Sequence, residues 1–309
     1  MRVFLMGANS YIGKALGKLL LQHGHSVSAL ARSEDSGREL VERGIGPVAG
    51  QVDEVACVTR ALAEHDACVW LSFISWRRER DAVAGLLSAL DGSGKTFIFT
   101  SGTAVLGIPS PTGDWHEGSF AEDDSFSPPD ALAFRRETEE RVREFGLRNV
   151  RAMVVRPPLV WGQGGGRQVT WLFETAVKTG AVCYIGRGLN VYSHVHVTDL
   201  AELYCLALER GLAGALYHAV AGEVCFGAMA EAVAQVLGCP VRSVSLEQMA
   251  EILGRGTAEI AFGLNSRSRC PRSRAELGWR PQHCDLIADI RCGSYPARFH
   301  PIEQPTRQS

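Results

Sequence analysis

A glycine-rich segment near the N-terminus carries the most explicit chemistry in this sequence. An apolar run over residues 2–6 breaks at Gly7, Gly13 follows six residues later, and apolar residues then recur at helical spacing. A strand, a tight turn and a helix in this order aim free backbone N–H groups at one point, where a phosphate group can bind. We therefore expect a dinucleotide pyrophosphate to bind along Gly7, Asn9, Ser10, Tyr11, Ile12 and Gly13.

Ser10 stands where the usual G-x-x-G-x-x-G spacing has its middle glycine. We expect its backbone N–H to remain available and its hydroxyl to add a donor. The alternative is a bare packing turn, because a strand, a turn and a helix with two glycines need not bind a ligand.

The end of the second apolar run, 26–31, argues against a bare packing turn and favours NADP as the dinucleotide. The residue about 20 positions past the glycine turn reads the adenosine ribose, and an acidic side chain there accepts from the 2′-hydroxyl of NAD. Arg32 and Ser33 occupy this place, and an arginine fork suits a 2′-phosphate. NAD is the less favoured alternative, with Arg32 solvated and Glu34 or Asp35 holding the ribose.

Two hydroxyl side chains, Ser101 and Thr103, follow the apolar run 96–100. Ligands of open α/β sheets bind at the carboxyl ends of the strands, where a hydroxyl can polarise a carbonyl group. Both residues are therefore candidate catalytic groups, and capping of the next turn is the structural alternative.

Apolar runs that alternate with helical patterns must position these groups. The predicted strands are 2–6, 26–31, 67–73, 96–100 and 151–155, and the predicted helices are roughly 12–23, 36–43, 54–64, 77–90 and 130–145. Strands that are apolar almost throughout, separated by helices, indicate a parallel sheet covered on both faces. A turn-rich stretch at 107–129 interrupts the alternation, and a glycine-rich loop spans 162–166.

Length and composition indicate a soluble globular chain. The 309 residues are 46% hydrophobic and 21% charged, and the net charge of −2 gives no reason to expect nucleic acid or an anionic membrane as a partner. No apolar stretch reaches the ~20 residues of a membrane span, and no secretory leader pattern is found, so we expect a cytoplasmic location. The nine cysteines lack C-x-x-C spacing and are expected as buried reduced thiols, with no metal site.

Four segments together resemble the extended short-chain dehydrogenase/reductase superfamily, in its NAD-dependent epimerase/dehydratase branch. They are residues 7–13, 97–103, 156–162 and 192–199, in matching order and spacing. The resemblance implies an α/β fold with a Rossmann-type doubly wound parallel sheet and a smaller C-terminal substrate domain. It places 1–158 with 191–220 in the Rossmann domain, 159–190 with 221–300 in the substrate domain, and 301–309 in a loose tail.

The same resemblance implies further contacts with cofactor and substrate. Ser72 and Phe73 would border the ribose and pyrophosphate, and the nicotinamide would meet Pro157, Pro158, Leu159 and Val160. Trp76 and Trp161 follow motif strands on the ligand side and could wall an aromatic or bulky apolar substrate. A homodimer through the helices at 77–90 and 130–145 is also implied.

The chain departs from the superfamily at its catalytic pair, Tyr-x-x-x-Lys, in which tyrosine transfers a proton and lysine lowers its pKa. None of the six tyrosines has lysine four residues on, so the chain resembles an atypical subgroup without the pair. Arg135 stands where the lysine would be and could bind the nicotinamide ribose or a substrate anion, although arginine stays charged. The alternative for Arg135 is a solvated helix face that pairs with Glu139.

His194 is a candidate general acid. It shares a predicted strand face with Tyr192, directed toward the substrate, whereas we expect His196 on the opposite face as an anchor between domains. The alternative for His194 is a structural histidine with satisfied hydrogen bonds. Two histidines without a third ligand do not make a metal site.

The favoured function is NADPH-dependent reduction of a carbonyl or conjugated double bond in a small aromatic or bulky apolar molecule. The proton would come from Thr103, Ser101, His194, water or the substrate. The missing catalytic pair leaves two alternatives open: non-redox isomerisation, cyclisation or elimination around a structural cofactor, and a regulator that senses the cofactor. The retained substrate domain favours an enzyme.

Overall fold

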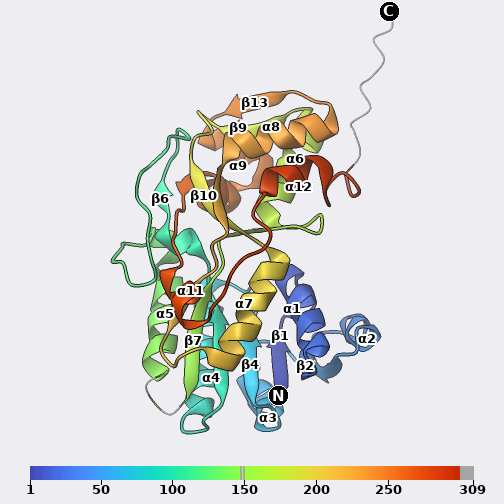
Figure 1. Ribbon diagram of the computed structural model, residues 1–309, viewed down its shortest axis with the longest axis vertical. Helices are drawn as coiled ribbons and strands as arrows, with labels where there is room; N and C mark the ends of the chain where they lie inside the picture. Colours follow the sequence, from blue (N-terminus) through green and yellow to red (C-terminus); the bar gives the residue numbers. More distant parts are fainter. Residues whose placement is uncertain (147, 149, 300–309) are drawn as a thin grey trace, which may run out of the picture.

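A seven-stranded parallel sheet forms the centre of the computed structural model, which describes residues 1–146, 148 and 150–299 (Figure 1). The strand order is β11-β7-β5-β4-β1-β2-β3, and each neighbouring pair is parallel. The order runs outward in both directions from β1, so the sheet is doubly wound. Its strands are β1 Arg2–Met6, β2 Ser26–Ala31, β3 Gly46–Ala49, β4 Ala67–Trp70, β5 Thr96–Thr100, β7 Arg151–Arg156 and β11 Leu216–His218. The tail expected at 301–309 lies outside the described residues.

Helices cover both faces of this sheet because successive side chains of a strand point to opposite faces. On one face, Val3 and Leu5 of β1 share a core with α1 (Tyr11–Gln22), α2 (Glu34–Glu42) and α7 (Val197–Arg210). On the other face, Phe4 and Met6 share a core with α3 (Val55–Ala63), α4 (Trp76–Leu90) and α5 (Ala133–Phe145). The Rossmann-type fold expected from the sequence is confirmed.

The two edge strands of the sheet, β3 and β11, were not predicted from the sequence. β3 contains Gly46 and Pro47 and is largely exposed, so it has neither the composition nor the apolar run of a central strand. β11 has three residues, which is too short for a periodic pattern. The predicted strand 67–73 is a strand only to Trp70, and residues 71–73 form the loop that leads to α4.

A smaller part of the chain lies above the Rossmann sheet in Figure 1, around a separate apolar core. It contains two small sheets, ordered β12-β10-β8 and β13-β9. Its elements are β8 Leu159–Trp161, α6 Arg167–Thr179, β9 Val182–Ile185, β10 Val191–His196, β12 Gly222–Cys225, α8 Phe226–Leu237, β13 Val241–Val244, α9 Leu246–Leu253, α10 Arg255–Thr257 and α12 Leu286–Cys292.

The chain crosses between the two parts more often than the predicted boundaries allow. β10 pairs with β8 and β12, so 191–196 belongs to the sheet of the smaller part rather than to the Rossmann domain. Conversely, Leu277 and Trp279, which follow α11 (Pro271–Glu276), are buried in the Rossmann core beside α7. Before this segment, β14 (Leu264–Asn265) pairs with β6 (Ile108–Pro109), which attaches the chain to the 107–129 loop. The predicted boundaries differ from the structure at both segments.

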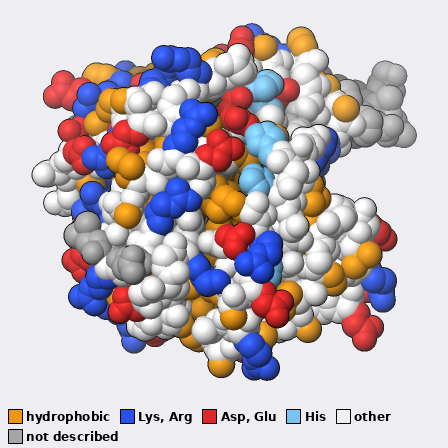
Figure 2. Space-filling model, turned by 60° about the horizontal axis from the view of Figure 1, so that its bottom comes forward, with side chains coloured by type: hydrophobic (Ala, Val, Ile, Leu, Met, Phe, Trp, Pro, Cys, Tyr) orange, Lys and Arg blue, Asp and Glu red, His pale blue; other side chains and the backbone are white. Residues whose placement is uncertain are grey.

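The surface carries charges of both signs and two exposed thiols. Acidic and basic side chains are interspersed over the face shown in Figure 2. In the described part of the chain, no helix is both long and apolar enough to cross a membrane. All nine cysteines are free, but Cys284 and Cys292 are exposed, so burial was wrongly expected for these two.

Candidate cofactor and substrate site

The glycine turn joins β1 to α1 at the carboxyl edge of the sheet, and its two glycines are required by close contacts. Gly7 has φ of +105°, and a Cβ there would lie 2.9 Å from the backbone of Leu71. A Cβ on Gly13 would lie 2.2 Å from the Gly7 carbonyl oxygen. A side chain at Gly7 would therefore clash with the segment after β4, and one at Gly13 would push the start of α1 away from the turn, so both positions require glycine.

Ser10 has a different part in this turn from the one predicted. Its N–H donates to the Gly7 carbonyl oxygen at 3.0 Å, and its hydroxyl accepts from the Gly13 N–H at 3.1 Å as the N-cap of α1. The Ser10 N–H is thus used inside the turn. The N–H groups of Tyr11 and Ile12 lie in the first turn of α1, where backbone donors have no partner within the helix.

Asn9 is a structural residue of the same turn rather than a direct ligand through its side chain. Its amide donates to the Ser36 carbonyl oxygen at 3.1 Å and accepts from Arg43 at 3.0 Å. Asn9 therefore ties the glycine turn to α2, which begins just after Arg32.

Arg32 lies exposed immediately after β2, and its side chain makes no hydrogen bond or ion pair with the residues that the structure describes. Ser33 caps α2 in a capping box, so it fixes the helix start beside the arginine. Asp35 pairs with Arg38 of the same helix, whereas Glu34 is exposed in the first turn. The residue predicted to contact the adenosine ribose, Arg32, thus presents an exposed guanidinium group.

An aromatic pair stands at the carboxyl end of β4. Phe73 is 61% exposed and meets the half-buried ring of Trp76 edge-on, with 5.0 Å between centroids. The Arg167 guanidinium, from the start of α6, lies 5.0 Å from the centre of the Phe73 ring. This contact bridges the Rossmann part and the smaller part beside Ser72.

Arg135 is buried in an ion pair and does not face a ligand, contrary to the prediction. Both oxygens of Glu79 accept from its Nη1 at 3.1 Å, and its remaining nitrogens donate to the Thr100 carbonyl oxygen at 2.7 Å and to Ser101 Oγ at 3.3 Å. The alternative of a solvated helix face is wrong as well. Burial raises the pKa of Glu79 to about 7, against the lowering effect of Arg135.

A second buried ion pair, between Arg156 and Glu139, lies on the other side of Ser101. Arg156 Nε donates to Glu139 at 2.8 Å. Burial opposes ionisation of Glu139, but Arg156 and a hydrogen bond from Ser101 outweigh it, so the pKa of Glu139 is held below its usual value. Ser101 is therefore the junction of two ion pairs, and its hydroxyl is used on both sides. Arg136 is the helix arginine that is partly exposed, and it pairs with Glu140.

Thr103 lies where it was predicted, after β5, but it is 1% exposed. Its Oγ1 accepts from Ser266 Oγ at 3.0 Å, and its N–H donates to the Pro157 carbonyl oxygen at 3.0 Å. The same Ser266 hydroxyl lies 2.8 Å from the Thr103 carbonyl oxygen, so its single proton is shared between two acceptors of Thr103. The bond to Pro157 brings it next to Pro158, Leu159 and Val160, the segment expected at the nicotinamide.

His194 is 3% exposed, which argues against its predicted role as a general acid toward a bound substrate. Its Nδ1 accepts from Trp161 Nε1 at 3.1 Å, and burial lowers its pKa to about 4. His196 also packs on Trp161, because residues two apart in a strand share a face, and the predicted opposite orientation is wrong. Trp161 and Tyr192 are each 2% exposed, and the Tyr192 hydroxyl donates to the Ile260 carbonyl oxygen. Neither side chain walls a substrate.

Tyr11 links the glycine turn to the glycine-rich loop at 162–166. Its hydroxyl donates to the Gly162 carbonyl oxygen at 2.6 Å, and its ring fills the space that a Cβ on Gly165 would need. The Tyr295 hydroxyl donates to the Gly165 carbonyl oxygen at 2.5 Å and fixes this loop from the other side. The cofactor turn and the smaller part are therefore joined directly.

The partners of Arg135, Arg156 and Thr103 were missed from the sequence. Glu79 falls one helical turn before the buried Val83, so its position on the apolar face of α4 was a usable signal. Glu139 likewise precedes the buried Val142 by three residues. Ser266 lies 163 positions from Thr103, and no local pattern connects them.

The comparisons with known proteins agree with this geometry. The NAD-dependent epimerase/dehydratase family matches residues 3–220. An uncharacterized protein of Schizosaccharomyces pombe is 31% identical, over 96% of this chain and 100% of its own. A Stigmatella aurantiaca protein, 4-hydroxy-2-methyl-3-oxo-4-farnesyl-3,4-dihydroquinoline-1-oxide ketoreductase, is 26% identical over 72% of this chain and 69% of its own.

The fold likeness extends over nearly the whole chain. A dTDP-glucose 4,6-dehydratase of Streptomyces venezuelae, solved with NAD bound, superposes with a TM-score of 0.78. The two chains are 19% identical, and the match covers 96% of this chain and 97% of the other. At this identity the likeness shows the fold alone.

Proposed function

The chain belongs to the NAD-dependent epimerase/dehydratase family, and from this premise we propose that it is an NADP(H)-dependent reductase. The substrate class would be a small aromatic or bulky apolar molecule with a carbonyl or conjugated double bond. The observation that carries the cofactor choice is Arg32, an exposed guanidinium beside the glycine turn, in the place of an acidic ribose ligand.

The residues that would hold NADP(H) come from both sides of the carboxyl edge. The first turn of α1 at Tyr11 and Ile12 would meet the pyrophosphate, and Arg32 the 2′-phosphate. Ser72 and Phe73 would border the ribose, and the segment 157–160 the nicotinamide. When bound, the nicotinamide supplies the hydride, and the chain's own residues orient the substrate against it.

Protonation of the product is the step for which this chain lacks the usual catalytic pair. Ser101 is held between two ion pairs, His194 is buried with its Nδ1 accepting from Trp161, and Arg135 stays charged. We assign proton donation to the Thr103 hydroxyl or to water, because Thr103 is the remaining candidate hydroxyl and is bonded to Pro157, at the start of the segment expected at the nicotinamide.

The substrate class rests on the aromatic pair Phe73 and Trp76. Phe73 is exposed, and the centre of the Trp76 ring lies 4.6 Å from the Arg135 guanidinium, which donates to Ser101. The related ketoreductase of Stigmatella aurantiaca bears the name of a farnesylated quinoline, a bulky aromatic substrate that carries an oxo group. That name supports the same class here.

Calorimetry with NADP⁺ and NAD⁺ tests the cofactor assignment. We expect NADP⁺ to bind at least tenfold more tightly, and Arg32→Ala to remove this preference while leaving NAD⁺ affinity unchanged. Arg38→Ala is the matched control, because Arg38 is exposed on α2 but pairs with Asp35. Equal affinities for the two dinucleotides, or no effect of Arg32→Ala, would show that the assignment to NADP is wrong.

A non-redox reaction is the second candidate, favoured by the lack of the Tyr-x-x-x-Lys pair in this chain. In such a reaction the bound cofactor would shape the pocket, and protons would pass through water or the substrate itself. Consumption of NADPH, followed at the nicotinamide absorbance while product forms, separates the two functions. Product formation with no net loss of NADPH supports the non-redox candidate.

A further inference from the structure

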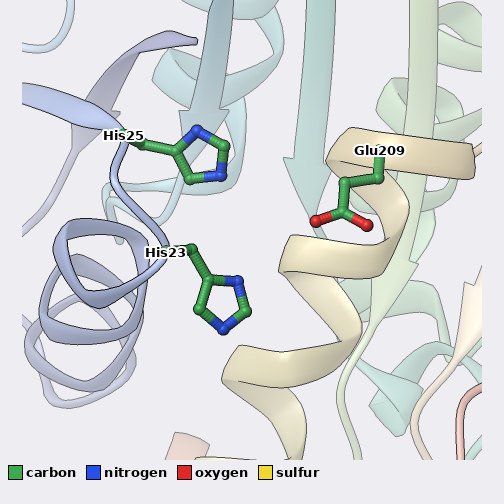
Figure 3. Close-up of side chains that lie close together, drawn as sticks. All are labelled: His23, His25 and Glu209. Atoms are coloured by element: carbon green, nitrogen blue, oxygen red, sulfur yellow. The ribbon is translucent and has the colours of Figure 1, made fainter.

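We propose that His23, His25 and Glu209 form a binding site for one divalent transition-metal ion of the zinc type. One ligand atom of each residue lies within 4.8 Å of the other two. Figure 3 shows the two imidazole rings and the carboxylate facing a common space between the end of α1 and the last turn of α7. No metal site is expected from the sequence, where Glu209 lies far from the histidines.

The ligand types select the metal class. Two imidazoles with one carboxylate suit Zn²⁺ and its neighbours, whereas Mg²⁺ and Ca²⁺ prefer oxygen ligands throughout. Tetrahedral coordination at about 2.0–2.1 Å puts ligand atoms roughly 3.4 Å apart. His23 and Glu209 are exposed, so small rotations of their side chains can close the remaining distance.

The backbone that carries the two histidines is fixed before any ion binds. Gly24, with φ of +78°, makes the sharp turn between them, and a Cβ there would meet nothing within 4 Å. The N–H groups of His23 and His25 donate to the Leu19 and Leu20 carbonyl oxygens at 3.0 Å each. The ordering of this loop is thus complete in the absence of the ion, which lowers the entropic cost of binding.

The surroundings of the cluster carry charge of both signs. α1 ends at Gln22 and α7 at Arg210, and the carboxyl end of each helix carries partial negative charge. The Met1 amino group already lies 3.2 Å from His25 Nδ1, and Arg210 Nε lies 4.0 Å from a Glu209 oxygen. A bound ion would displace both groups, so we expect moderate affinity.

The site is separate from the cofactor site. α1 has 12 residues, so its end lies about 18 Å from the glycine turn at its start. An ion there would clip α1 to α7, the two helices that cover one face of the Rossmann sheet, and would act on stability rather than on chemistry.

Titration of the full-length chain, without a histidine tag, with Zn²⁺ in a calorimeter tests this proposal. We expect one ion per chain and a raised melting temperature. His23→Ala, His25→Ala and Glu209→Gln should each weaken binding at least tenfold. His116→Ala is the matched control, because this loop histidine lies outside the cluster and should leave binding unchanged.

Co²⁺ as a second probe separates this site from the exposed thiols of Cys284 and Cys292. Ligation by nitrogen and oxygen gives visible d–d bands without a thiolate charge-transfer band. Absence of saturable binding, a thiolate band, or binding that survives all three substitutions would overturn the proposal. All three variants change exposed or half-exposed side chains, and their circular dichroism checks that they fold.

Discussion

The two ends of the ligand-binding edge differ in how their polar groups are used. At the glycine turn, Arg32 is exposed, and Tyr11 and Ile12 in the first turn of α1 are only partly buried. At the end of β5, Ser101, Thr103 and Arg135 are buried, and their partners come from the protein itself. The difference teaches that polar groups at one edge of a sheet can stay accessible at one strand end and be satisfied inside the protein at another.

The largest effect is expected from breaking the buried pair at the β5 end. Glu139→Ala leaves Arg156 buried without a counter-charge, and we expect a loss of about 3–5 kcal/mol in the free energy of unfolding. Urea unfolding measures it. Glu140→Ala, which removes a half-exposed carboxylate of the same helix that pairs with Arg136, should cost less than about 1 kcal/mol. Equally small losses for the two variants would contradict a stabilising role of the buried Arg156–Glu139 ion pair.

A pH-dependent effect of somewhat smaller size is expected at His194. Its pKa is about 4 in the folded chain and about 6.5 in the unfolded chain, so the folded state binds fewer protons between these values. Stability contributed by neutral His194 is complete above pH 6.5 and falls as the pH drops toward 4, by up to about 3 kcal/mol.

His194→Gln tests this contribution, because the glutamine carbonyl oxygen can still accept from Trp161 Nε1. We expect the loss of stability between pH 6.5 and pH 4, measured by urea unfolding, to shrink in this variant. His116→Gln should not change the slope. An unchanged slope in the His194 variant would return this residue to the list of candidate acids.

At the glycine turn, we expect Gly13→Ala to weaken NADP⁺ binding at least tenfold, which corresponds to about 1.4 kcal/mol. The new Cβ would lie 2.2 Å from the Gly7 carbonyl oxygen and displace the start of α1. Gly37→Ala is the control, since its Cβ would meet ordinary contacts of 3.7 Å and more. Calorimetry compares the two variants, and equal affinities would break the link between this turn and the cofactor.

The smallest effect is expected at Ser266. Ser266→Ala removes the hydrogen bond to Thr103 Oγ1 and should cost about 1 kcal/mol in the free energy of unfolding. NADP⁺ affinity, measured by calorimetry, should not change, because this hydrogen bond lies after β5 and away from the glycine turn. A fall in affinity would show that the two ends are coupled.

The elements could be predicted from sequence because their signals are local. β1, the glycine turn and α1 follow one another within about twenty residues, and their apolar spacing states the order directly. The contacts of the buried polar side chains could not be predicted in the same way. Arg135 meets Glu79 across 56 positions, and burial decides whether an arginine on a helix faces water or an ion pair. His194 and Trp161 meet across 33 positions for the same reason.

The path of the chain between the two parts limits how such a protein can be rebuilt. The smaller part is assembled from separate stretches, and the segment with Leu277 and Trp279 returns to the Rossmann core before α12 crosses over again. The smaller part is therefore not a module that can be exchanged by one cut and one join. A change of substrate specificity is therefore better made by substituting side chains on loops, such as the loop that carries Phe73, than by exchanging the smaller part.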